Sequence, residues 1–101
     1  MSGPPFQLLY TDEARQVVKD LSKPAHAAKL KKVKKTLRLL RDVGPSLPGL
    51  NSHKYQSITG ANGEEVWESY VENRTPGAWR IWWTDGPQPD TITIITLGPH
   101  P

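Results

Sequence analysis

The chain has 101 residues and a net charge of +3, and because this is a common size for one domain we expect a single domain over residues 1–101. With 36% hydrophobic and 23% charged residues, the composition is that of a globular protein and excludes a disordered chain. There is no cysteine, which excludes disulfides, zinc–thiolate sites and a cysteine nucleophile. No apolar run reaches the ~18–20 residues of a membrane span, and no signal-peptide pattern opens the chain. We therefore expect no membrane contact and a cytoplasmic location.

The first predicted elements are a short strand and a helix. Phe6 to Tyr10 is an apolar run with strand-forming ends. Thr11 is a typical helix N-cap, and acidic residues follow it in the first turn, where they favour the positive end of the helix dipole. Apolar residues then recur at helical spacing from Ala14 to Leu21.

A second helix carries most of the positive charge. Pro24 is typical of a helix start, apolar residues continue at helical spacing to Leu40, and Gly44 followed by Pro45 ends the pattern. The short connection predicts an antiparallel pair of helices. Between Pro24 and Arg41 there are seven basic residues and no acidic one, so the rest of the chain has a balance of −4. This stripe indicates either contact with a polyanion or acidic protein, or simply a solvated helix face. The candidate RNA-binding residues within it are Lys31, Lys35 and Arg38.

The second half of the chain predicts strands. Residues 45–63 are rich in proline, glycine and asparagine and are interpreted as a loop. The apolar period then changes to two over residues 66–72, 78–84 and 91–97, with short turns between them. The predicted fold class is α+β: an N-terminal strand, an antiparallel helical hairpin and a three-stranded antiparallel meander, all in one sheet packed on the helices.

The alternation of side chains assigns the two faces of this sheet. One face is apolar and should pack on the helices; its members are Trp67, Ser69, Val71, Trp79, Ile81 and Trp83. The other face should lie outside; its members are Val66, Glu68, Tyr70, Glu72, Arg80, Trp82 and Thr84. An arginine among aromatic and acidic residues makes this outer face a candidate ligand surface.

The order and spacing of these elements resemble the RelE/ParE toxin superfamily of type II toxin–antitoxin systems. The resemblance runs nearly end to end, over LLYTDEARQVVKDL, AAKLKKVKKTLRLL, PGLNSHKY, GEEVWESYV, AWRIWW and TIITLGPH. It implies a RelE-like fold and a ribosome-dependent endoribonuclease that cuts messenger RNA, represses translation and is silenced by a cognate antitoxin. It also implies that Arg80, His100 and Lys54 occupy the positions of the family's functional residues.

The chain departs from the family pattern at two places. Glu68, Ser69 and Tyr70 stand on the first meander strand, where many family nucleases carry arginine or lysine. The chain ends at Pro101, without the C-terminal helix of some members. Because the gyrase-poisoning branch shares the fold and not the chemistry, the fold alone does not establish catalysis.

Metal-independent RNA cleavage needs a base, a cation and an acid around the reacting phosphate. Arg80 fits the cation, since guanidinium offers a rigid fork to phosphate oxygens; the alternative is a surface arginine stacked on Trp82. His100 fits the proton donor, and the alternative is a frayed terminus. Lys54 is a candidate phosphate ligand and His53 a second proton carrier, unless both belong to an ordinary surface loop.

Three further residues complete the candidate site. Glu68 is either the general base or a cross-strand ion-pair partner of Arg80. Tyr70 and Trp82 would stack on unpaired RNA bases, or form the floor on which an antitoxin segment lies.

The sequence leaves three functions open. The first is the endoribonuclease, with ribosome, messenger RNA and an acidic antitoxin segment as partners. The second is a non-catalytic inhibitor that binds a target such as a topoisomerase, and the third is a homologue without toxicity that only binds a partner. The three histidines lack metal-ligand spacing, so no metal is expected, and no cofactor is implied.

Overall fold

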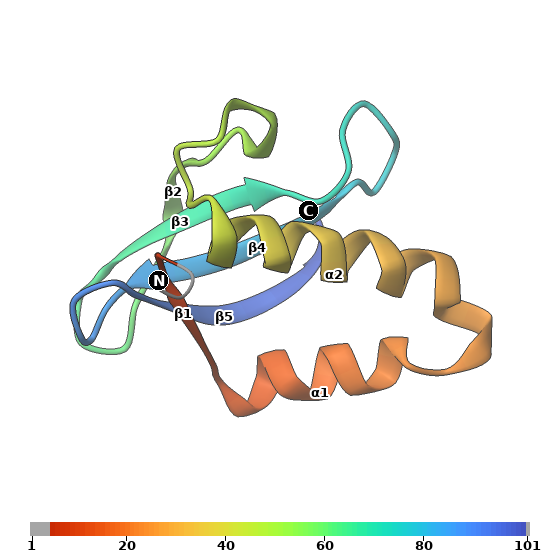
Figure 1. The fold of residues 1–101 in the computed structure, drawn as a ribbon, viewed down its shortest axis with the longest axis horizontal. Coiled ribbons are helices and arrows are strands. Elements are labelled where there is room, and N and C mark those ends of the chain that lie inside the picture. Colours follow the sequence, from red (N-terminus) through yellow and green to blue (C-terminus); the bar gives the residue numbers. More distant parts are fainter. Residues whose placement is uncertain (1–4, 101) are drawn as a thin grey trace.

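The computed structural model describes residues 5–100, and its architecture is the predicted α+β fold (Figure 1). Two helices pack on one face of a five-stranded mixed sheet. The helices are α1 (Asp12–Leu21) and α2 (Ala27–Asp42). The strands are β1 (Gln7–Tyr10), β2 (His53–Thr59), β3 (Glu65–Tyr70), β4 (Trp79–Asp85) and β5 (Thr91–Pro99). Single 3-10 turns lie at Pro24–His26 and Pro48–Leu50.

The helical hairpin forms where the sequence predicted it. The Thr11 hydroxyl accepts the Ala14 N–H at 3.1 Å and so caps α1, and it also donates to the Ile95 carbonyl on β5. Pro24 begins the 3-10 turn that leads into α2. Gly44 has a φ of 109° and donates its N–H to the Leu39 carbonyl, which ends α2.

The sheet has the strand order β1-β5-β4-β3-β2. β1 pairs in parallel with β5, and all other pairs are antiparallel. The interpretation of residues 45–63 as one loop is wrong for residues 53–59, which form the edge strand β2 against β3. The alternation signal is absent there because β2 is exposed on both faces except at Tyr55.

The two faces of the sheet are assigned as predicted, with one exception. Ile81 and Trp83 lie in the core beneath the helices, and Trp67 stacks on Trp83 with ring centroids 5.9 Å apart. Glu72 is the exception: β3 ends at Tyr70, and the Glu72 carboxylate reaches Lys29 and Lys32 on α2. The chain direction changes after the strand, so strict alternation no longer holds there.

The outer face is more buried than its polar composition suggested. Glu68, Arg80 and Trp82 are only 2%, 8% and 6% exposed. The Tyr55 ring on β2 lies 5.7 Å from the Trp82 ring on β4, although β3 separates these strands. The twisted sheet therefore curls, and its edge strand covers part of the outer face.

Candidate functional site

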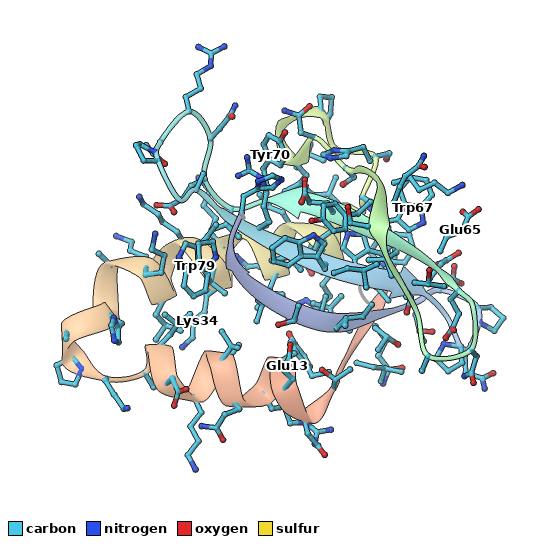
Figure 2. All side chains as sticks on the ribbon, turned by 180° about the vertical axis from the view of Figure 1, so that it is seen from behind. Glu13, Lys34, Glu65, Trp67, Tyr70 and Trp79 are labelled. Atoms are coloured by element: carbon cyan, nitrogen blue, oxygen red, sulfur yellow. The ribbon has the colours of Figure 1, made fainter. Side chains whose placement is uncertain are left out.

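The outer face holds a cluster of ionisable side chains around the Glu68 carboxylate. His53 Nε2 on β2 lies 2.9 Å from Glu68 Oε1. Arg80 Nε on β4 lies 3.9 Å from the same oxygen, and His100 Nε2, just after β5, lies 3.7 Å from Oε2. Four strands thus bring one buried carboxylate and three groups that can carry positive charge to one place. Figure 2 views the molecule from this side, with α2 behind the sheet.

The hydrogen bond of His53 to the Asn51 carbonyl fixes a proton on Nδ1. His53 Nδ1 is 2.7 Å from the Asn51 carbonyl, which can only accept, so Nδ1 carries a proton. The 2.9 Å contact between His53 Nε2 and Glu68 Oε1 then needs one more proton, on the imidazole or on the carboxyl. The pair is therefore able to give or take a proton without moving its heavy atoms. Asn51 holds this carbonyl in place with a left-handed backbone, φ 50°.

Arg80 is held along the sheet rather than left free. Its Nη1 donates to the carbonyls of Glu72 and Trp79, and its Cζ lies 3.6 Å from the centroid of the Tyr70 ring. The alternative of a surface arginine stacked on Trp82 is wrong: Arg80 is buried and stacks on Tyr70, which stands opposite it in the strand register. The guanidinium is thus pre-oriented on this face by an aromatic ring and two carbonyls.

The cluster contains polar atoms with unused hydrogen-bonding capacity. In residues 5–100, the buried side-chain atoms without a hydrogen bond are Glu68 Oε2, Arg80 Nε and Trp82 Nε1. All three belong to the outer face. Since buried polar atoms are usually paired, such a concentration is typical of a functional site rather than of a structural core.

His100 is anchored, so the alternative of a frayed terminus is wrong. Its backbone N–H donates to the Ala78 carbonyl at 2.9 Å, next to the start of β4. Its ring lies 6.4 Å from the Tyr55 ring, and its side chain is 44% exposed. The imidazole is therefore both positioned and open to a ligand.

The other predicted RNA-binding residues are not brought to this cluster. Lys54 pairs with Trp67 in the register and its Nζ lies 2.8 Å from Glu65, so it faces away from Glu68. Lys31, Lys35 and Arg38 lie exposed on α2, across the sheet. Trp82 is too buried to stack on a base, and Tyr70 already carries Arg80. Two residues of the site were not predicted from the sequence: Tyr55, which packs on Trp82 and His100, and Asn51, whose carbonyl binds His53. Only the aromatic side chain of Tyr55 was a signal that could have indicated it.

Glu72 joins α2 to the edge of this site. Its carboxylate accepts from Lys29 and Lys32 and from the backbone N–H of Trp79. Hydrogen bonds from Lys29, and then from Lys32, lower the pKa of Glu72 from 4.5 to about 2, while desolvation opposes them. The carboxylate is therefore ionised throughout the physiological pH range.

This pKa predicts a pH-dependent contribution to stability. Because the pKa of Glu72 is lower in the folded state, its contribution is complete above the unfolded value of 4.5 and is lost as the pH falls towards about 2. Urea unfolding of the wild type and of Glu72→Gln should differ by at most about 3 kcal/mol at pH 7. The difference should approach zero near pH 2, and a difference that is constant with pH would contradict the ion-pair explanation.

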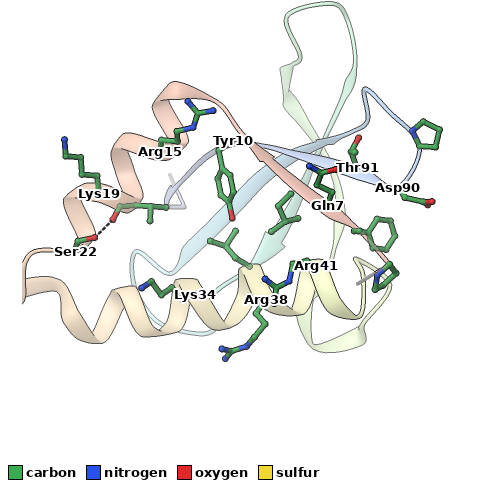
Figure 3. A pocket seen from close by; sticks show the side chains of 16 residues that line it. Gln7, Tyr10, Arg15, Lys19, Ser22, Lys34, Arg38, Arg41, Asp90 and Thr91 are labelled. Carbon is green, nitrogen blue, oxygen red and sulfur yellow. Dashed lines mark hydrogen bonds between the residues drawn. The ribbon is translucent and has the colours of Figure 1, made fainter. Parts of the chain in front are cut away.

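A second feature is a groove of about 1200 Å³ between α1, α2 and β1 (Figure 3). Figure 3 shows Tyr10 pointing into the space between the helices, and burial raises the pKa of this hydroxyl while Arg41 opposes the shift. Apolar side chains form the floor: Phe6, Leu8, Val18 and Leu37. Basic side chains form the rim: Arg15, Lys19, Lys34, Arg38 and Arg41. One acidic side chain, Asp90, also lines the groove. The lining is therefore apolar with an excess of positive charge.

Residues 5–100 hold neither a metal-ligand cluster nor a membrane-spanning helix. They contain no group of three or more histidine, aspartate or glutamate side chains arranged to hold a metal ion. None of the helices in this range is long and apolar enough to cross a membrane.

No protein-family model matches the sequence, and no curated protein matches it. Solved toxin structures do match the fold. A chain of the archaeal RelE–RelB complex from Pyrococcus horikoshii is 12% identical, with a TM-score of 0.63 and 94% of both chains covered. The YoeB dimer from Staphylococcus aureus is 12% identical, with a TM-score of 0.67 over 96% of this chain and 99% of that one. A chain of the E. coli DinJ–YafQ toxin–antitoxin complex is 18% identical, with a TM-score of 0.65 over 95% and 93%. The chain therefore has the RelE-like toxin fold.

Proposed function

We propose that this chain is the toxin of a type II toxin–antitoxin system, a ribosome-dependent endoribonuclease that represses translation in the cytoplasm. The observation that carries the proposal is the convergence of His53, Arg80 and His100 on the buried carboxylate of Glu68. The RelE-like fold supports it, since the similar structures include RelE and YafQ in toxin–antitoxin complexes.

The four side chains supply the groups that RNA cleavage needs. The Glu68–His53 pair accepts the proton of the 2′-hydroxyl, whose oxygen then attacks the adjacent phosphorus. Arg80 stabilises the additional negative charge of the phosphorane. His100 gives its proton to the 5′-oxygen as the P–O bond breaks, which leaves a 2′,3′-cyclic phosphate and a free 5′-hydroxyl.

Regulated expression in a bacterial host tests this function. Mapping transcript ends after induction should reveal new cuts inside translated codons, and blocking translation initiation should remove them. Growth arrest with intact messages would instead support the target-binding inhibitor. Expression without arrest or cuts would support the homologue that only binds a partner.

The proposed protein partner is an antitoxin with an acidic amphipathic segment. The groove between α1, α2 and β1 has an apolar floor and five basic side chains on its rim. Apolar side chains of such a segment would cover the floor, and its carboxylates would lie against the rim. A small acidic protein encoded beside this chain is the partner to isolate.

Reversing charge on the groove rim should weaken this complex. The double variant Arg38→Glu with Arg41→Glu is expected to raise the Kd for the antitoxin by more than ~10-fold, chiefly through slower association, and to reduce its salt dependence. The matched control is Lys31→Glu with Lys35→Glu, which changes α2 by the same charge outside the groove. Equal losses for the two variants would indicate a non-specific effect of net charge.

A further inference from the structure

Glu72 uses every polar group it has, and its contacts join α2 to the first two residues of β4. Its two carboxylate oxygens accept from Lys29 and Lys32 on α2. Oε1 also accepts the backbone N–H of Trp79 at 3.2 Å, at the first residue of β4. Its own N–H donates to the Trp79 carbonyl, and its carbonyl accepts from Nη1 of Arg80.

These contacts connect α2 to the guanidinium of Arg80 across the sheet. Lys29 and Lys32 donate to the Glu72 carboxylate. The Glu72 carboxylate and backbone N–H bond to the backbone of Trp79, and the Glu72 carbonyl accepts from Nη1 of Arg80. Lys29 adds a contact of its own, since its Nζ lies 5.4 Å from the centroid of the Trp79 ring. The carboxylate is 12% exposed, so water competes little for these bonds.

Without its carboxylate, Glu72 would keep only backbone contacts. The N–H groups of Val71 and Glu72 share a single acceptor, the Trp79 carbonyl, at 3.1 and 3.2 Å. Glu72 lies at the base of an exposed turn, residues 73–77, in which Arg74 and Gly77 have left-handed backbones. One shared acceptor beside such a turn is a weak constraint on the carbonyl that orients Arg80.

We propose that Glu72 is a positioning residue of the candidate site: its carbonyl holds the guanidinium of Arg80 beside the Glu68 carboxylate, and its own carboxylate is fixed by Lys29 and Lys32. This inference rests on the proposed function, because it takes the cluster around Glu68 to be catalytic. The chain of contacts from α2 to Arg80 is a property of the fold and does not depend on that function. Glu72 does not touch substrate, because its carboxylate lies on the helix face of the sheet.

Kinetics of Glu72→Gln give the first test. The kcat for cleavage of ribosome-bound message should fall by at least about tenfold, because a small displacement of a charge-stabilising group is costly, while KM stays nearly constant. Asp20→Asn is the matched control, an acid-to-amide change on the surface of α1. In an Arg80→Lys background, Glu72→Gln should change kcat by less than about twofold, since its effect passes through Arg80. An equal fall in kcat in both backgrounds, or a rise in KM with kcat unchanged, would overturn the proposal.

A second measurement does not depend on activity. The Nε–H signal of Arg80 in a nitrogen-15 NMR spectrum, identified by its loss in Arg80→Lys, should shift or broaden in Glu72→Gln and stay unchanged in Asp20→Asn. If the wild type cuts no message, the proposed function fails and this signal still decides the positioning role. If Glu72→Gln does not fold, Lys32→Gln replaces it, since the Lys32 side chain is largely exposed and its Nζ donates to the Glu72 carboxylate. An unchanged Arg80 signal in a folded variant contradicts the proposal.

Discussion

Arg80→Ala is expected to lower the rate of message cleavage by ~10²–10³, the usual cost of removing one preorganised group that stabilises transition-state charge. The guanidinium is held in place before substrate arrives, by Tyr70 and by two backbone carbonyls. The loss should therefore appear in kcat rather than in substrate binding. The measurement is single-turnover cleavage of ribosome-bound message by the purified variant.

Two comparisons separate this effect from a folding defect. Arg80→Lys keeps the charge but loses the planar fork and the contact with Tyr70, so it should recover only a small part of the rate. Arg74→Ala removes an exposed arginine from the neighbouring turn and should leave the rate unchanged. Circular dichroism and thermal unfolding of each variant complete the comparison, because Arg80 is buried beside Glu68.

His100→Ala is expected to reduce the rate by ~10²–10⁴, the range for loss of a general acid or base. The imidazole is 44% exposed and its backbone is tied to Ala78, so the fold should survive the change. A substrate with a better leaving group at the 5′-oxygen should restore much of the rate, since such a group needs no proton.

His26→Ala is the matched control for His100, because His26 is exposed in the turn between the helices, far along the chain from the cluster. It should cleave at the wild-type rate. If Arg80→Ala and His100→Ala also cleave at that rate, the proposed site is wrong. The non-catalytic inhibitor then becomes the better interpretation.

The sequence by itself determined the helical hairpin and which side chains of the central strands face the helices. The helix-end signals are local: Thr11, Pro24 and Gly44 each act on the backbone of neighbouring residues. The helix ends can therefore be predicted without knowing any tertiary contact. The alternation in β3 and β4 placed Trp83 beneath the helices and Arg80 outside for the same local reason.

Only the tertiary structure decided how the outer face became a site. β2 carries no alternation because it is an edge strand, and its pairing of His53 with Glu68 depends on register, which residues far apart in the chain set together. The curl of the sheet then brings Tyr55 over Trp82 and buries Glu68, and this curl has no signature in local spacing. Glu72 follows the same rule: alternation placed it outside, but the strand ends first and the lysines of α2 attract its carboxylate to the other face. Local chemistry fixed the elements, whereas long-range pairing and twist fixed which ionisable groups meet.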